Sequence, residues 1–294
     1  MIKVSPARKA FVIVNYIFCI IVAFVCIMPV IHVLAVSFSS KDPVLSGRVT
    51  FWPLQFTLDS YGIIVRDSSF YRSYLVTFER VLLGLAVNTV MTVLAAYPLS
   101  LSQVRFPARK YFTWYFMGTI LFSGGMIPTY LVVKETGLYD NIFSLIVPGA
   151  VPVYNIILMM NFMKGLPDAI SEASYIDGAG HMQTLAKIII PLCKPSIATV
   201  SLFTVLSHWN AWFDGMIYIK TPALKPLQTY LRSIIIVDAS ISDVAVDLED
   251  MIANVNSDST NGAKIFLAML PVLIFYPFVQ KHFAKGIVRG SVKD

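Results

Sequence analysis

The sequence is poor in charge. Of its 294 residues, 14% are charged and 56% are hydrophobic, and the mean hydropathy is +0.70. A soluble globular domain carries about 25% charged residues, so the chain lacks the polar surface that water requires. The formal charge of +6 is not gathered into one strip, because the Lys and Arg residues lie in short stretches between apolar runs. This pattern argues against nucleic-acid binding and predicts a protein embedded in a lipid bilayer.

Cysteine and histidine are scarce. Cys19, Cys26 and Cys193 show no CxxC spacing, and four scattered histidines form no HExxH motif. A metal centre needs such spacing, so we expect no metal site and no catalytic residues. The sequence GxxxxGK[ST], which cradles the phosphates of a nucleotide, is also absent. We therefore expect no cofactor in this chain, and any energy from ATP must come from another polypeptide.

Six segments are long and apolar enough to be read as membrane-spanning helices. They are Phe11–Phe38, Leu75–Ser100, Tyr111–Val133, Ile142–Met163, Ser196–Ile219 and Ile265–Gln280. Because the runs are continuous rather than alternating, they favour helices over a strand barrel. The first run is too long for a signal-peptide core. The last is short, and we expect Lys264 and Lys281 to extend outward to cover the deficit.

The distribution of Lys and Arg predicts the orientation. With the N-terminus inside, basic residues outnumber acidic ones in the cytoplasmic parts, and the short stretch Ser102–Lys110 holds Arg105, Arg109 and Lys110 without an acid. Positive charge concentrates on the cytoplasmic side of membrane proteins. We therefore expect an all-α integral membrane protein with six transmembrane helices and both termini in the cytoplasm.

Two outer stretches are long, Ser39–Tyr74 and Lys220–Lys264. Stretches of this length are functional or are solvated linkers. Both readings stay open from the residues alone.

One inner stretch, Gly165–Lys194, is unlike a simple connection. Pro167 and Asp168 are typical of a first helical turn, and Gly178-Ala179-Gly180 is typical of a helix end. A second amphipathic run, Met182–Ile190, is expected to stop before Pro191. The pattern predicts two short helices around a glycine turn, forming a compact knob at the membrane surface.

The same stretch resembles the "EAA" loop of the inner-membrane subunits of ABC importers. The resemblance rests on Glu172-Ala173-Ser174, Asp177-Gly178-Ala179, Ile188, Pro191 and Pro195. It departs from the usual pattern at Ser174, where alanine is usual, and at Ile190, where leucine is usual. Further similarity to carbohydrate permeases that take up oligosaccharides or polysaccharide fragments lies in Phe122–Tyr130, His208–Phe213 and Pro226-Leu227-Gln228, and is strongest between residues 71 and 282.

The resemblance implies a type I ABC importer permease fold and an assembly. A second homologous permease subunit would complete a heterodimer, two copies of a cytoplasmic ATPase would bind ATP and Mg, and an extracytoplasmic solute-binding protein would deliver an oligosaccharide. The setting would be the bacterial inner membrane, spanned several times. Glu172 would contact the ATPase, Ala173 would pack into it, and Gly178 would make the turn. No nucleic acid is expected as a partner.

The implied organisation has three parts: an N-terminal transmembrane helix with an external loop (1–70), the permease core (71–282) with its coupling loop (165–194), and a cytoplasmic tail (283–294). The basic tail suits a plain anchor at an anionic membrane surface. The family resemblance raises contact with the ATPase dimer as the alternative.

Polar residues inside spans are costly and tend to face the bundle interior or a watery path. The candidates for a translocation path are Asn88, Thr92, Tyr154, Asn155, Thr204, Ser207, His208, Trp209, Asn210 and Trp212. The alternative is that these groups bond neighbouring helices or sit at the membrane interface. Ser123-Gly124-Gly125, Pro128, Pro148 and Pro152 predict kinks or broken helices.

Two other classes of function compete with a permease subunit. A secondary transporter or channel would show internal repeats and buried charges for ion coupling. No repeat is evident, and the charge that we identify inside a span is Asp214. A membrane enzyme would need a convergent acid, base or metal set, which the scattered histidines do not provide.

Overall fold

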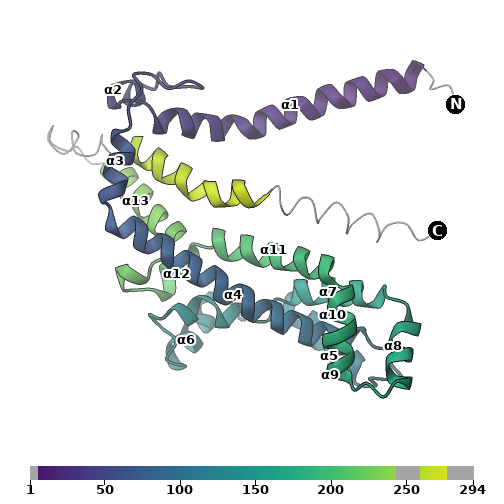
Figure 1. Ribbon diagram of the computed structural model, residues 1–294. Coiled ribbons are helices and arrows are strands. Elements are labelled where there is room, and N and C mark those ends of the chain that lie inside the picture. Colours follow the sequence, from purple (N-terminus) through teal and green to yellow (C-terminus); the bar gives the residue numbers. More distant parts are fainter. Residues whose placement is uncertain (1–5, 243–258, 277–294) are drawn as a thin grey trace. The chain divides into compact units, whose positions relative to one another are not determined.

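The computed structural model describes residues 6–242 and 259–276 (Figure 1). The chain divides into two compact units, Met1–Ser68 with Leu231–Leu270 and Ser69–Tyr230 with Pro271–Asp294. Within the described residues the regular structure is helical, apart from one isolated bridge between Ser39 and Phe56. The predicted all-α class is confirmed. The expectation for the tail 283–294 lies outside the described residues, as does most of the acidic part of the second outer stretch.

Three described helices are long and apolar enough to cross a membrane, and up to six spans result if each bent helix pair counts as one. The single helices are Ala7–Ser37, Ser68–Ser100 and Ser259–Tyr276. The bent pairs are Arg109–Leu121 with Met126–Glu135, Ile142–Gly149 with Val153–Lys164, and His181–Leu192 with Lys194–Asn210.

The first unit holds α1 (Pro6–Ser37), α2 (Lys41–Leu45) and α3 (Asp59–Arg66). Hydroxyl groups join its parts: the Ser60 and Ser259 Oγ atoms lie 2.9 Å apart, and Ser259 Oγ donates to the carbonyl of Ser39 at 2.9 Å. Lys264 Nζ forms an ion pair with Asp67 Oδ2 at 2.7 Å. A carboxylate within reach stabilises this buried ammonium group. The direction of the Lys264 side chain relative to a membrane stays a prediction, and Lys281 lies outside the described residues.

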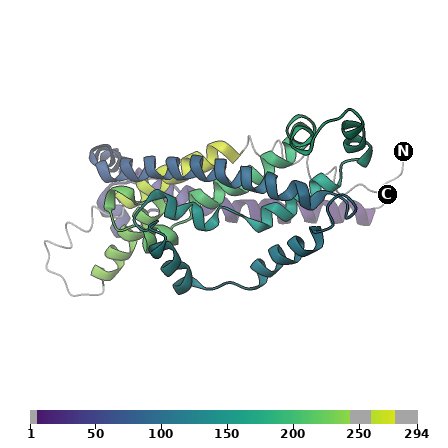
Figure 2. The same cartoon turned by 90° about the horizontal axis from the view of Figure 1, so that it is seen from below.

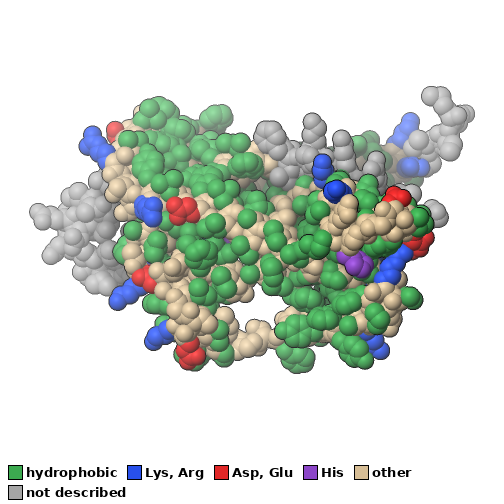
Figure 3. All heavy atoms as spheres, turned by 60° about the horizontal axis from the view of Figure 1, so that its bottom comes forward, with side chains coloured by type: hydrophobic (Ala, Val, Ile, Leu, Met, Phe, Trp, Pro, Cys, Tyr) green, Lys and Arg blue, Asp and Glu red, His purple; other side chains and the backbone are tan. Residues whose placement is uncertain are grey.

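The second unit is built around α4 (Ser68–Ser100), α7 (Val153–Lys164) and α11 (Lys194–Asn210). Its buried apolar cluster includes Ala96, Ile156, Met159 and Val200 from these three helices, together with Leu185. Much of the face in Figure 3 is covered by apolar side chains, which suits a lipid environment better than water. The buried core therefore lies along α4, the longest element of this unit.

Glycine and proline break the helices where the sequence predicts breaks. Between α5 (Arg109–Leu121) and α6 (Met126–Glu135) the chain bends by 111°, and Gly125 adopts φ +84°. That left-handed backbone is open to glycine at no steric cost. Figure 2 shows the two helices as separate pieces joined by an extended stretch. Pro148 and Pro152 accompany the 49° bend between the short turns η1 (Ile142–Leu145) and η2 (Val147–Gly149) and α7.

The fifth predicted segment, Ser196–Ile219, is not one helix. The helix α11 ends at Asn210, and a separate α12 (Phe213–Tyr218) follows, then the short turn η4 (Pro222–Leu224) and α13 (Leu227–Ser242). The bend of 83° that pairs α11 with an earlier helix lies at its start, next to Cys193. The continuous apolar pattern hid this break, because periodicity reports burial rather than a change of direction.

Candidate functional site

A cavity of about 680 Å³ lies inside the second unit. Its volume falls in the range of roughly 300–1,000 Å³ that is usual for ligand sites. Elements α4, α7, α11 and α12 and the turns η1 and η2 supply its walls. Six of the ten residues predicted for a translocation path line it: Asn88, Tyr154, Asn155, Thr204, Ser207 and His208.

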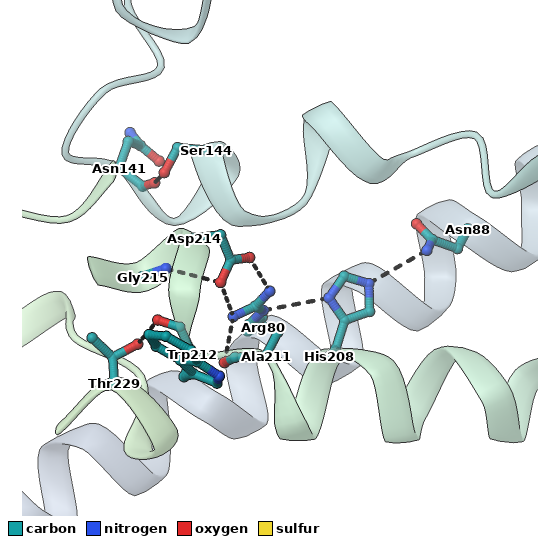
Figure 4. A network of polar contacts seen from close by, with 10 residues as sticks. All are labelled: Arg80, Asn88, Asn141, Ser144, His208, Ala211, Trp212, Asp214, Gly215 and Thr229. Atoms are coloured by element: carbon teal, nitrogen blue, oxygen red, sulfur yellow. Dashed lines mark hydrogen bonds and ion pairs between the residues drawn. The ribbon is translucent and has the colours of Figure 1, made fainter. Parts of the chain in front are cut away.

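A chain of polar contacts runs along one wall of the cavity (Figure 4). The guanidinium of Arg80 pairs with both carboxylate oxygens of Asp214 through Nη1, at 3.1 Å, and Nη2. Its Nε donates to His208 Nδ1 at 3.4 Å, and His208 Nε2 lies 3.4 Å from Asn88 Nδ2. Arg80, Asn88 and His208 are buried. The contacts join α4 to α11 and α12 and place one cation and one anion beside the cavity.

Close helix approach makes this chain possible. A Cβ atom at Gly84 would lie 2.4 Å from His208 Nε2, so only glycine leaves room for the imidazole against α4. In α12, a Cβ atom at Gly215 would lie 2.2 Å from Thr229 Oγ1 of α13. That hydroxyl donates to the carbonyl of Trp212.

The rest of the cavity wall is suited to hydroxyl-bearing ligands. Asn155 Nδ2 donates to Thr204 Oγ1 at 3.3 Å, which holds α7 against α11. Tyr154, Phe203 and Tyr218 contribute aromatic rings to the lining. Amide and hydroxyl groups beside aromatic faces can bind the polar edge and the apolar face of the same small ligand.

The four remaining path candidates lie elsewhere. Trp209 packs edge-on against Tyr74 and Phe78 of α4, with ring centroids 5.8 and 5.4 Å away. Asn210 Nδ2 donates to the backbone of its own helix, and the ring of Trp212 packs against Phe213. Thr92 is buried without a hydrogen-bond partner among the described residues. These positions do not line the cavity.

The role of Arg80 was not predicted from the sequence. Identifying Asp214 as the charge inside a span was incomplete, because Glu79 and Arg80 also fall within the predicted Leu75–Ser100 segment. A cation in an apolar run needs a partner, and the signal was three charges in two predicted spans, Glu79 and Arg80 in one and Asp214 in the other. These charges left Arg80 two possible carboxylate partners, Glu79 and Asp214.

The stretch 165–194 folds as the predicted knob. The helix α8 (Asp168–Ile176) follows Pro167, and Gly178 turns the chain at φ +77° before α9 (His181–Thr184) begins. Ser174 Oγ lies 3.1 Å from Thr184 Oγ1, and Tyr175 OH lies 3.0 Å from His181 Nδ1. Ser174 thus holds the two short helices together, which gives a role to the serine where alanine is usual.

The second half of the knob does not stop before Pro191. A π-helical turn, η3 (Leu185–Ile189), leads into α10 (Ile190–Leu192), which contains the proline. Proline removes one backbone donor and crowds the preceding turn, and a wider π turn accommodates that crowding. The expected end of the helix at Ile190 was therefore wrong.

Arg105 ties the knob to the stretch that follows α4. Its Nη2 lies 3.3 Å from Glu172 Oε1, and its guanidinium lies 5.0 Å from the centroid of the Tyr175 ring. Tyr97, in the last turn of α4, places its hydroxyl 3.3 Å from that of Tyr175. The knob is therefore attached to α4 at the end remote from Arg80, about 25 Å along the helix axis at 1.5 Å per residue.

The outer surface of the knob carries exposed apolar side chains beside small residues. Ile176 and Met182 are exposed at 86% and 67%. The remaining residues predicted for this loop divide by exposure: Glu172, Ala173, Asp177, Gly178 and Pro191 are exposed, Ala179 and Ile188 are half-buried, and Ser174 is buried. Exposed large apolar side chains beside small ones are typical of a protein-binding surface.

Asp140 joins two connecting stretches of the second unit. Its carboxylate accepts hydrogen bonds from the backbone of Lys220 at 2.9 Å and of Thr221 at 2.8 Å, and from the Thr221 hydroxyl at 2.7 Å. The Thr221 donors hold the pKa of Asp140 below its ordinary value of 3.8. Its φ of +59° is a conformation that Asp and Asn tolerate better than most residues.

Comparison with known proteins gives clear relatives. The chain is 37% identical over 288 residues to the polygalacturonan/rhamnogalacturonan transport system permease protein YtcP of Bacillus subtilis, covering 97% of this chain and 99% of the relative. It is 33% identical, with a TM-score of 0.85, to a chain in the crystal structure of a bacterial ABC transporter involved in the import of the acidic polysaccharide alginate, covering 96% and 100% of the two chains.

A second solved chain, from a bacterial alginate ABC transporter in complex with an alginate pentasaccharide-bound periplasmic protein, is 14% identical with a TM-score of 0.54 over 92% and 93% of the chains. At that identity the likeness concerns the fold alone. No protein-family model matches the chain.

Proposed function

The chain belongs to the permease subunits of sugar ABC importers, and from that membership we propose that it forms half of a saccharide translocation path driven by ATP hydrolysis on a partner. The observation that carries the proposal is the end-to-end match to a sugar permease at 37% identity. The fold agrees with the proposal, because α4 lines a polar cavity with Arg80 and Asn88 and contacts the knob separately through Tyr97.

The partners follow from the family. A second permease subunit supplies the other half of the path, two ATPase copies supply the energy, and an extracytoplasmic binding protein supplies the saccharide. In the absence of a GxxxxGK[ST] motif, ATP and Mg would be held by the ATPase rather than by this chain. The assembly lies in a bacterial cell membrane, with both termini of the chain inside according to its Lys and Arg distribution.

The knob 165–194 is the proposed coupling loop. Its apolar surface, with Ile176 and Met182 exposed, suits a cleft on the ATPase, and Ala173 permits close approach. Glu172 is 60% exposed and pairs with Arg105 inside this chain, so it has room to accept a second donor from the ATPase. Motion of the knob would reach the cavity through Tyr97 and the continuous helix α4.

The cavity is the proposed saccharide site. An oligosaccharide offers hydroxyl groups and apolar ring faces, which match the amides, hydroxyls and aromatic rings of the lining. The names of the relatives favour fragments of acidic polysaccharides as the cargo. Alternating access would open the cavity to each side in turn.

Purification and uptake test this proposal. A tagged chain extracted from its native membrane should bring down an ATPase and a second permease. Vesicles containing the assembly, loaded with ATP and supplied with the binding protein, should take up radiolabelled trigalacturonate. Uptake by the chain without any ATPase would contradict the proposal.

Substitution of Glu172 tests the coupling role. Glu172→Lys reverses the charge offered to the ATPase, so uptake per ATP hydrolysed should fall strongly while the assembly stays intact. Asp168→Asn, in the first turn of the same helix, is the matched control and should keep most of the coupling. Equal effects of the two changes would show that general helix damage, rather than a specific contact, causes the loss.

A further inference from the structure

The stretch between α2 and α3 contains an apolar run that lies outside the spans. Residues 49–58, VTFWPLQFTL, carry no charge, and Arg48 and Asp59 flank them. The side chains of Trp52 and Phe56 are 80% and 66% exposed. Large apolar side chains gathered on a surface mark a site that a partner or a membrane covers.

The first limb of this run lies beside α1 rather than beyond its end. The carbonyl of Thr50 lies 2.9 Å from His32 Nδ1, and the ring centroids of Phe51 and Phe24 are 6.5 Å apart. Figure 1 shows the stretch after α2 extending along the C-terminal part of α1. Both contacts join the run to residues inside α1, so the chain turns back along the helix after leaving it.

The second limb returns to the end of α1. Phe56 forms the isolated bridge with Ser39, and its ring stacks on that of Phe38 with centroids 5.4 Å apart. The backbone N–H of Leu54 donates to Ser39 Oγ at 3.0 Å. Residues 49–58 are therefore held at both limbs, and they form a fixed excursion along α1 rather than a solvated linker.

With α1 taken as a membrane span, counting residues gives the depth of the run. The 31 residues of Ala7–Ser37 extend about 46 Å, which matches the roughly 40–45 Å of a bilayer with its headgroups. His32 lies about 8 Å from the Ser37 end, close to the border between headgroups and hydrocarbon. Phe24 lies about 20 Å from that end, inside the hydrocarbon. Phe51, which contacts Phe24, therefore lies at the level of the acyl chains.

The surface of α1 that receives the run has the character of a lipid-facing surface. In the most apolar 18-residue window of α1, no residue is buried within the structure. Surfaces that pack against another membrane helix favour small residues, whereas Phe18 and Phe24 project from α1 with 63% and 60% exposure. The run lies on this surface, so the lipid that covers α1 also reaches the run.

The residues of the run match the chemistry of the membrane interface. Tryptophan is enriched where acyl chains meet headgroups, because its ring is apolar and its N–H group needs a polar neighbour. Arg48, which is exposed, has a long side chain that can reach lipid phosphates while its stem stays in apolar surroundings. A cation beside large apolar side chains suits a phospholipid surface.

We propose that residues 49–58 are an interfacial anchor that lies in the lipid leaflet at the C-terminal end of α1. The Trp52 ring lies at the boundary between acyl chains and headgroups, and the Arg48 guanidinium binds lipid phosphates. The anchor fixes the depth of α1 in the bilayer. It is independent of which saccharide the cavity binds.

The test measures the depth of position 52 in the complete transporter, reconstituted in vesicles of phosphatidylglycerol and phosphatidylethanolamine. Trp52→Cys, in a transporter whose other cysteines are replaced, carries a nitroxide label. Collisions with oxygen, which concentrates in hydrocarbon, are compared with collisions with a water-soluble nickel chelate. The label should lie about 15 Å from the bilayer centre, at the edge of the hydrocarbon.

Two exposed positions of the same unit are matched controls for this depth. Asp42→Cys, in α2, should contact the nickel chelate freely, because its carboxylate faces water. Phe18→Cys, in the middle of α1, should be reached by oxygen alone. The label at position 52 should fall between the two and closer to Phe18→Cys.

A second measurement needs no substitution. Phosphatidylglycerol with a diazirine at the start of its acyl chain is activated by light in vesicles that contain the unmodified transporter. Trypsin cuts after Lys41, Arg48 and Arg66, which separates peptide 42–48 from peptide 49–66. Lipid adducts should occur within residues 49–58 and be absent from peptide 42–48.

Three results would overturn the proposal. Nickel contact equal to that of Asp42→Cys, without lipid adducts, would make the run a solvated linker. A label that neither oxygen nor nickel reaches would mean that another subunit covers Trp52. A label that is reached by nickel and becomes shielded when the external binding protein is added would make the run a docking site for that protein.

Discussion

Two arginines, Arg80 within α4 and Arg105 just beyond its end, show how burial determines what an ion pair contributes. Arg80 is 2% exposed and faces a cavity, whereas the side chain of Arg105 is 28% exposed and that of its partner Glu172 is 60% exposed. A buried charge that loses its partner remains desolvated. A surface charge that loses its partner is solvated by water and screened by salt.

The difference suggests a division of labour. Arg80 lines the cavity, is buried, and contacts Asp214, His208 and the backbone of Ala211. Losing Asp214 would therefore leave a desolvated charge. The Arg105 pair is held by one ion pair and one ring contact, so it would break at low cost if the knob moves as the proposed coupling role requires. Contacts that must exchange during a transport cycle need to be weak, and exposed ion pairs are weak.

The largest expected effect that tests this comparison is the loss of Arg80. Arg80→Ala leaves Asp214 without its cation and His208 without its donor, and should lower the stability of the complex by about 3 kcal/mol. The measurement is the thermal unfolding temperature of the purified complex in detergent.

The double variant Arg80→Ala with Asp214→Ala is the matched control, because it removes both charges together. It should recover part of the lost unfolding temperature. A double variant as unstable as the sum of the two single variants would show that the pair is not coupled, and the contrast with Arg105 would collapse.

A smaller effect is expected from the close approach of the helices. Gly84→Ala introduces a Cβ atom 2.4 Å from His208 Nε2, which should cost about 1–3 kcal/mol by overpacking. Gly118→Ala, inside α5 with open space around it, is the control and should stabilise by up to about 1 kcal/mol through helix propensity. Thermal unfolding measures the change in stability of each variant, and the two changes should have opposite signs. Equal shifts would mean that the imidazole moves aside freely.

Much of this structure could be predicted from the sequence because the signals were local. Glycine at position 125 and prolines at 148 and 152 predicted breaks that the structure confirms. Gly178 predicted the turn of the knob. Each of these residues restricts the backbone by itself, so no knowledge of the neighbours was needed.

Features that depend on distant partners were harder to predict. Trp209 shares a helix with cavity residues but packs against Tyr74 and Phe78, and the choice of face depends on where α4 lies. Lys264 is paired with Asp67, 197 positions earlier in the chain. Arg80 and Asp214 are charges inside predicted spans, although the sequence alone does not fix which helices meet.

The Arg105 pair should contribute little to stability. Arg105→Gln should change the unfolding temperature by no more than an equivalent of about 1 kcal/mol, yet it should loosen α8. Hydrogen–deuterium exchange of the peptide that covers 168–176 should speed up at low ionic strength. In the wild type, added salt should produce the same increase, because it screens the pair. A fall in stability as large as that for Arg80→Ala would remove the distinction between the two ends.

Asp140 supplies the smallest expected effect and isolates the role of exposure. Like Glu172 it is a carboxylate outside the spans, but neutral donors from Thr221 and Lys220 bind it instead of a cation. Because its pKa is lowered in the folded state, the stabilisation is complete above its ordinary value of 3.8 and is lost as pH falls through the lower folded value. The protection of the Thr221 amide, measured against its intrinsic exchange rate at each pH, should therefore fall below about pH 4. Asp140→Asn tolerates the same left-handed backbone but has no charge to titrate, so its exchange should show no such step. A step that survives in Asp140→Asn would assign the pH response to another group. A change in the global unfolding temperature would show that this carboxylate contributes as much to stability as a buried one.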